Sequence, residues 1–188
     1  MIEIRWHGRG GQGAKTVAML LADAALAAGK YMQAFPEYGP ERMGAPVQSF
    51  NRISDQPILM HCSVKEPGVV AVLDPTLMAT VKVTAGLKDD GILLVNTSLS
   101  PAEIKKQTKF AGTVYTLDAS KISQETIGRN IPNTPMLGAL VRITGILDFD
   151  AMVEDTEKKL AKKFAHRPEV IEGNIKSIRR AAQEVRAA

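Results

Sequence analysis

A cluster of four glycines between two patterned segments constrains this chain more than any other feature of the sequence. Residues 1–7 alternate apolar and polar side chains, as a β-strand does, and residues 14–29 are rich in Ala and Leu, as a helix stopped by Gly29 would be. Glycines between a strand and a helix let the backbone approach a ligand, and the helix start offers unpaired N–H groups. The segment His7–Gly13 therefore predicts either an anion site or simply a tight turn with close helix packing.

Two standard phosphate-binding motifs nearly fit this cluster, but neither is complete. Three of its glycines match the dinucleotide pattern G-x-G-x-x-G, which also requires an acidic residue at the end of the second strand. The predicted second strand, Tyr31–Phe35, has none. The nucleoside-triphosphate loop fails because Ala14 separates the last glycine from Lys15. An independent NAD(P)-binding oxidoreductase of the Rossmann kind remains an alternative.

The rest of the chain predicts an α/β fold with a largely parallel, buried sheet, because short apolar strands alternate with helices. Further strands are expected at residues 47–53, 69–73, 91–96 and 113–117, and helices at 118–128, 134–147, 152–164 and 168–185. Asp118 is expected to cap its helix, and Gly138 and Gly145 are expected to permit close backbone approach. There is no internal repeat or linker, so residues 1–188 are predicted to form a single domain.

Composition excludes several classes of function. The net charge is +4, from 24 basic and 20 acidic residues, and no basic tract interleaves with aromatic residues, which argues against nucleic acid as a partner. The single cysteine, Cys62, permits no internal disulfide and cannot hold an iron–sulfur cluster, which fits a reducing compartment. The N-terminus has no signal-peptide layout and no apolar run is long enough to span a bilayer. These features predict a cytoplasmic protein without a membrane partner.

The sequence shows no self-contained catalytic apparatus and no metal site, since neither H-E-x-x-H nor C-x-x-C spacing occurs. His61 and Cys62 are adjacent, but neighbours in a strand point to opposite faces, so a buried thiol and a satisfied histidine are expected. Asp74 and Asp118 each follow a strand, where we expect them to act as turn or cap residues.

Four stretches together resemble the gamma subunits of pyruvate:ferredoxin oxidoreductases, and the resemblance runs nearly end to end. They are Ile4–Ala14, Ala34–Val47 (AFPEYGPERMGAPV), Ile131–Leu140 (IPNTPMLGAL) and Pro168–Ile175 (PEVIEGNI). The second stretch is far more specific than a glycine loop. It departs from the usual family pattern at Met43, where Arg is common, which could signal a substrate other than pyruvate.

The resemblance implies a three-layer α/β/α sandwich with a mostly parallel central sheet and C-terminal helices, as one part of a larger enzyme. It implies alpha, beta and ferredoxin-like delta subunits as partners, with thiamine diphosphate, Mg²⁺ and [4Fe-4S] clusters on those chains. The complex would convert pyruvate, coenzyme A (CoA) and oxidised ferredoxin to acetyl-CoA, CO₂ and reduced ferredoxin. This chain would serve as a structural and CoA-access domain without its own redox centre.

Site residues carried over from the resemblance are expected to approach the pyrophosphate of CoA or to meet a neighbouring subunit. They are Gly8, Arg9, Gly10, Gly11, Gln12, Gly13, Lys15, Glu41 and Arg42. Alternatives are a gamma subunit for a branched-chain or aryl 2-oxoacid such as phenylglyoxylate, the Rossmann-type enzyme above, and a non-catalytic structural or regulatory module.

Overall fold

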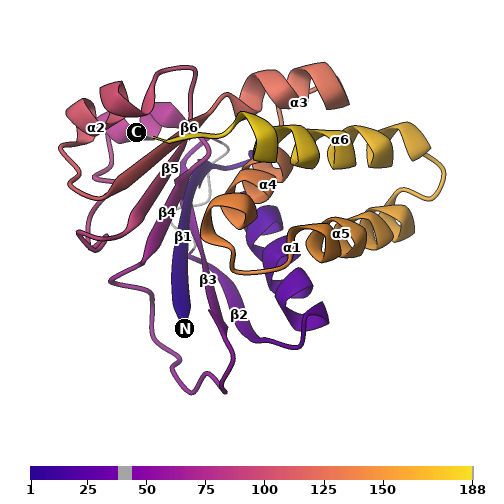
Figure 1. Cartoon of the computed structure of the whole chain (residues 1–188), viewed down its shortest axis with the longest axis horizontal. Helices are drawn as coiled ribbons and strands as arrows, with labels where there is room; N and C mark the ends of the chain where they lie inside the picture. Colours follow the sequence, from indigo (N-terminus) through magenta and orange to yellow (C-terminus); the bar gives the residue numbers. More distant parts are fainter. Residues whose placement is uncertain (38–43, 188) are drawn as a thin grey trace.

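The structure is a computed structural model that describes residues 1–37 and 44–187 (Figure 1). Its elements, in chain order, are β1 (Ile2–Arg9), α1 (Ala14–Ala27), β2 (Tyr31–Glu37), β3 (Pro46–Ser54), β4 (Val69–Val72), the 3₁₀ helix η1 (Pro75–Ala79), β5 (Ile92–Asn96), α2 (Pro101–Thr108), β6 (Thr113–Leu117), α3 (Ala119–Ile127), α4 (Asn133–Thr144), α5 (Phe149–Lys163), α6 (Pro168–Glu184) and β7 (Arg186–Ala187).

The strands form a seven-stranded sheet in the order β2-β3-β1-β4-β5-β6-β7. Strands β1, β4, β5 and β6 pair in parallel, whereas β3 is antiparallel to β1 and β2, and β7 is antiparallel to β6. Five of the seven strands therefore run in one direction, and only β3 and β7 oppose them. The prediction of a mostly parallel central sheet is confirmed.

Helices cover both faces of this sheet, one much more thickly than the other. Figure 1 shows α1, α4, α5 and α6 packed on one face and α2 on the opposite face. Alternate side chains of β4 supply the two cores: Val69 and Ala71 join the helical cluster, while Val70 and Val72 join a smaller cluster with η1 and α2. This arrangement confirms the three-layer α/β/α sandwich and its C-terminal helices.

Several element boundaries differ from the sequence predictions. Strand β1 continues two residues further, so that Gly8 and Arg9 belong to the strand and only residues 10–13 form the turn. Helix α2 and strand β7 were not predicted at all. The signal for α2 was present, because Ser100 and Glu103 form a capping box around Pro101. Asp118 caps α3 as expected, accepting a hydrogen bond from the backbone of Lys121 at 2.9 Å.

Helices α4 and α6 approach each other closely at Gly138. A Cβ atom added at Gly138 would fall within 3.0 Å of the Ile178 carbonyl oxygen, so only glycine fits there and that expectation is confirmed. Gly145 has open space around it and instead ends α4 in the left-handed conformation, so the expectation for it was wrong. The buried face of α6 consists largely of small residues, including Ser177 and Ala181. These small side chains allow the two helices to pack closely.

Replacing Gly138 with alanine should lower the free energy of unfolding by about 1–3 kcal/mol, because backbone atoms of α6 must move to admit the methyl group. The matched control is Gly68→Ala, whose added Cβ would meet only the Glu3 carbonyl oxygen, at an ordinary 3.9 Å. Urea denaturation of both variants provides the measurement. Equal stabilities for the two would show that the α4–α6 contact is looser than described.

Two basic side chains of β1, Arg5 and His7, are buried on the sheet face that lies opposite α1. Arg5 donates hydrogen bonds to the carbonyl oxygens of Val83 and Ala85, at 2.9 and 2.5 Å. His7 is 2% exposed, and among the described residues its Nε2 atom has no hydrogen-bond partner. Burial, followed by repulsion from Arg5, lowers the pKa of His7 from 6.5 to about 4, although a hydrogen bond with Val83 opposes the change. His7 is therefore neutral in the folded protein at neutral pH.

Stability should fall as the pH is lowered from about 6.5 to about 4, because the unfolded chain protonates His7 in this window and the folded chain does not. The loss over the window should reach roughly 3 kcal/mol and should level off below pH 4 as far as His7 is concerned. Denaturant titrations at a series of pH values measure it. His7→Gln should flatten this slope, whereas His166→Gln, an exposed position, should preserve it.

Candidate functional site

The glycine loop lies at the carboxyl ends of the parallel strands, where open α/β sheets bind their ligands. Strand β1 runs beside β4, with His7 opposite Val72, so the loop after β1 lies next to Asp74, which follows β4. Asp74 also caps η1 by accepting a hydrogen bond from the Thr76 backbone at 2.9 Å, as expected from the sequence.

Side chains brace the loop from within and from the neighbouring strand. The Gln12 side chain accepts a hydrogen bond from the Arg9 backbone at 2.8 Å and donates one to Asp74 at 2.7 Å. The Arg9 guanidinium ion-pairs with Asp74 at 3.1 Å and donates to Thr76 at 2.8 Å and to the Gly44 carbonyl at 3.1 Å. The charge of Arg9 is thus matched by a carboxylate, and the loop conformation is fixed without a ligand.

Asp74 is ionised at the centre of this network. Its partial burial would raise the pKa of the carboxyl group, but hydrogen bonds from Thr76 and Gln12, with the nearby positive charge of Arg9, outweigh burial and lower the pKa. The carboxylate is therefore a permanent acceptor that holds Arg9 and Gln12 in place. Asp74 was predicted as a turn or cap residue, but its link to the loop was not predicted.

The turn leaves backbone donors available where the helix begins. The N–H groups of Gly11, Gly13 and Ala14 have no hydrogen-bond partner within the described ranges 1–37 and 44–187, whereas that of Gly10 donates to the Ala45 carbonyl oxygen at 3.0 Å. Helix α1 has neither a side-chain cap nor an acidic residue in its first turn. Its positive end is consequently open to an anion.

Gly13 has two reasons to be glycine. Its φ is 82°, in the left-handed region, and an added Cβ would lie 2.5 Å from Nδ2 of Asn133 on α4. Asn133 belongs to the third stretch of the family resemblance, which the sequence could not connect to the loop. The structure therefore joins the first and third stretches at one point.

A cavity of about 310 Å³ opens beside the loop. It is lined by Lys15 of α1, by Glu37 at the end of β2 and by four of the predicted loop residues: Arg9, Gly10, Gly11 and Gly13. Two predicted site residues, Gly8 and Gln12, do not line this cavity. Gly8 lies within β1, and the Gln12 side chain is hydrogen-bonded to Arg9 and Asp74. The predicted site residues Glu41 and Arg42, with Met43, lie outside the described residues, although the chain re-enters the structure at Gly44 beside Arg9.

The position of Glu37 corrects one sequence argument. Strand β2 extends to Glu37, so an acidic residue does end the second strand, contrary to the prediction that stopped it at Phe35. The dinucleotide fold nevertheless fails on topology, because antiparallel β3 lies between β1 and β2. In the Rossmann arrangement these two strands are direct parallel neighbours.

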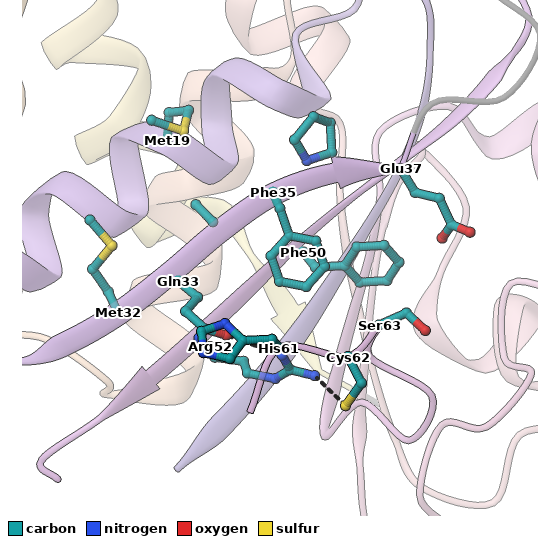
Figure 2. Close-up of a pocket in the computed structure, with 12 residues that line it drawn as sticks. Met19, Met32, Gln33, Phe35, Glu37, Phe50, Arg52, His61, Cys62 and Ser63 are labelled. Carbon is teal, nitrogen blue, oxygen red and sulfur yellow. Dashed lines mark hydrogen bonds between the residues drawn. The ribbon is translucent and has the colours of Figure 1, made fainter. Parts of the chain in front are cut away.

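A larger cavity, about 670 Å³, lies elsewhere, along the edge strand β2 (Figure 2). The cross-strand neighbours Phe35 and Phe50 line it with ring centroids 5.3 Å apart and a tilt of 31°, and Arg52 lies beneath them. Arg52 is already paired with Glu3 at 2.7 Å, so its charge does not mark this cavity as a site for an anionic ligand. Cys62 lines it and is exposed in an irregular segment, so the predictions of a strand and of a buried thiol there were both wrong.

Among residues 1–37 and 44–187, no group of three histidine, cysteine or acidic side chains is placed to hold a metal ion. In the same part of the chain, no helix is both long enough and apolar enough to cross a membrane. The fold and the site thus define a class: an open α/β sheet domain with a braced glycine loop at the carboxyl ends of its parallel strands.

The particular family follows from comparison with known proteins. The family described as pyruvate ferredoxin/flavodoxin oxidoreductase matches residues 3–184, and the chain belongs to this family. It is 51% identical over 186 residues to pyruvate synthase subunit PorC of Thermotoga maritima, covering 99% of this chain and 95% of that protein.

One further relative and one solved structure agree. The chain is 52% identical over 155 residues to the pyruvate/ketoisovalerate oxidoreductases common subunit gamma of Thermococcus kodakarensis, covering 82% of this chain and 84% of that one. The crystal structure of pyruvate oxidoreductase subunit PORC from T. maritima has a TM-score of 0.87 at 49% identity, covering 100% of this chain and 98% of that chain. The predicted resemblance to gamma subunits is confirmed.

Proposed function

We propose that this chain is the gamma subunit of a thiamine-diphosphate-dependent complex that converts pyruvate, CoA and oxidised ferredoxin to acetyl-CoA, CO₂ and reduced ferredoxin. The observation that carries this proposal is the near end-to-end match, at about half identity, with a pyruvate synthase subunit. Residues 1–188 act as a single gamma-type domain. Alpha, beta and delta subunits are its partners and carry thiamine diphosphate, Mg²⁺ and the [4Fe-4S] clusters, and the assembly works in the cytoplasm.

The role of this chain within the complex is to hold CoA at the glycine loop. The pyrophosphate of CoA accepts hydrogen bonds from the N–H groups of Gly11, Gly13 and Ala14, which have no partner within the described ranges. Lys15, in the first turn of α1, lines the same cavity and adds positive charge. Arg9 and Gln12 contribute by holding the loop against Asp74.

A second candidate concerns the acid that is oxidised. The T. kodakarensis relative is named as a subunit common to pyruvate and ketoisovalerate oxidoreductases, so a branched-chain 2-oxoacid is a specific alternative substrate. In this proposal the substrate contacts lie on the partner subunits, so we do not expect this chain to select between the two acids.

The test is to isolate the complex from its host without oxygen and to measure CoA-dependent ferredoxin reduction with a panel of acids. Pyruvate should give the highest kcat/KM, with acetyl-CoA as the product, and omission of CoA should abolish acyl-CoA formation. A preference for 2-oxoisovalerate or phenylglyoxylate would change the assigned acid. Turnover of none of the 2-oxoacids would overturn the proposed function.

A further inference from the structure

Strand β2 forms one edge of the sheet, and no strand lies on its outer side (Figure 1). In the part of the chain that the structure describes, the backbone of residues 32–37 forms hydrogen bonds only with β3. The opposite edge is closed by β7, which is only two residues long. A seven-residue strand left open at an edge is a template for pairing with another strand.

Pro36 shows which backbone groups of β2 point outward. It is paired with Ser49 in the ladder although it has no N–H group, so it occupies a position between the hydrogen-bonded pairs. Because alternate residues of a strand point the same way, Met32 and Ala34 direct their N–H and C=O groups away from β3. Pro36 adds its carbonyl oxygen to this open row.

The side chains beside this open row are largely apolar. Met32 packs at the rim of the helical core, and Met19 of α1 lines the 670 Å³ cavity together with it (Figure 2). Met19 is 42% exposed, and Leu26, two turns further along α1, is 61% exposed. Apolar side chains gathered at an open strand edge are typical of a surface that another protein covers.

The sequence of β2 complements itself when two copies run antiparallel with Ala34 opposite Ala34. The two Ala34 residues then exchange both of their hydrogen bonds, and each Met32 N–H meets the Pro36 carbonyl oxygen of the other copy. The N–H group that Pro36 lacks therefore leaves only one bond unmade at each end.

The side chains of the two strands also match in this register. Tyr31 of one copy lies opposite Glu37 of the other, so a phenol hydroxyl can donate to a carboxylate, and both side chains are exposed. Glu37 is the one charged residue of β2, and its two copies lie at opposite ends of the paired strands. No like charges meet across the two strands.

We propose that β2 is a docking edge for a second copy of this chain, which joins two sheets into one continuous sheet across a two-fold axis at Ala34. A second copy is the occupant because a two-fold interface requires a surface that complements itself, and β2 does so in its hydrogen bonds, its apolar row and its charges. Two copies of this chain are therefore in contact within the proposed complex. This contact is independent of any ligand at the glycine loop.

The first experiment places one thiol on the proposed axis, in the full chain with Cys62→Ser as background. In Ala34→Cys the two thiols belong to residues whose Cα atoms are about 5.5 Å apart, whereas in Tyr31→Cys they lie at opposite ends, roughly 20 Å apart. A short bis-maleimide should cross-link Ala34→Cys into a dimer at least tenfold faster than Tyr31→Cys. Absence of a dimer, or equal rates for the two positions, would overturn the proposal.

The second experiment measures self-association of the full chain by sedimentation equilibrium. The wild type should have twice the mass of the 20.3 kDa chain at micromolar concentrations. Met19→Lys/Leu26→Lys should raise the dimer Kd at least tenfold without changing Tm, since both side chains are exposed. Leu99→Lys, at an exposed position that follows β5, should leave the Kd unchanged. A monomeric wild type throughout the micromolar range would contradict the proposal.

The same cross-linking in the assembled complex separates this inference from the proposed function. Ala34→Cys, paired with a cross-linker that reaches any nearby cysteine or lysine, should join two copies of this chain. A product with a different subunit would show that another chain covers β2, and would overturn the inference while the proposed function stands. A joined pair in a complex that turns over none of the 2-oxoacids would have the opposite meaning.

Discussion

Replacing Glu3 with alanine should lower the free energy of unfolding by about 3–5 kcal/mol, because it would leave a buried cation without its partner. Glu3 is the carboxylate partner of Arg52, at 2.7 Å, and the Arg52 side chain is 1% exposed. Its guanidinium also donates to the Gln33 amide oxygen at 3.1 Å and to the Cys62 sulfur at 3.8 Å, and lies 5.6 Å from the centre of the Phe35 ring. None of these three groups carries the full negative charge that Glu3 supplies.

The control for this prediction is an exposed ion pair on the same sheet edge. Lys30 and Asp55 are 2.6 Å apart, and the Asp55 side chain is 82% exposed. Asp55→Ala should therefore have little effect on stability, since both charges stay hydrated. Denaturant unfolding of both variants at pH 7 is the measurement. If Glu3→Ala is as stable as Asp55→Ala, the Arg52 guanidinium must reach water, and the buried pair described here is wrong.

Replacing Gly13 with alanine should raise the KM of the complex for CoA at least tenfold. The new methyl group would occupy the space of Asn133 Nδ2, 2.5 Å away, in a backbone conformation that costs alanine about 1–2 kcal/mol. Relief of this clash must move the loop, and with it the N–H groups of Gly11 and Ala14. Steady-state kinetics of the assembled complex at varied CoA concentrations provide the measurement.

A matched variant separates loop geometry from general strain. Gly128 also has a positive φ, 75°, but an added Cβ there would meet nothing within 4 Å. Gly128→Ala should therefore share the conformational cost and leave the KM for CoA unchanged. The same KM in wild type, Gly13→Ala and Gly128→Ala would exclude a role of the loop in binding CoA and would favour a purely interfacial role.

The parts of the fold that the sequence predicted are those set by local pattern. The strand–glycine–helix unit follows from alternation in residues 1–7 and from the Ala/Leu-rich segment, and Asp118 was identifiable as a cap from its position after a strand. The close backbone approach at Gly138 was also predicted, because glycine within a helix pattern commonly marks close packing.

The parts that sequence reasoning missed depend on contacts between distant segments. The insertion of β3 between β1 and β2 decides against the dinucleotide fold, yet strand order leaves no local signal in the sequence. Asp74 holds Gln12 across 62 residues, and Asn133 reaches Gly13 from a helix much later in the chain. Cys62 was misplaced because an irregular segment was interpreted as a strand.

The central claim is that this chain works as one subunit of a larger oxidoreductase. The most direct test is to tag the chain in its host, purify it without oxygen and determine by native mass spectrometry what is bound to it. Larger subunits carrying thiamine diphosphate and iron–sulfur clusters should accompany it. A lone 20.3 kDa protein, or a simple homo-oligomer of it, would contradict the claim.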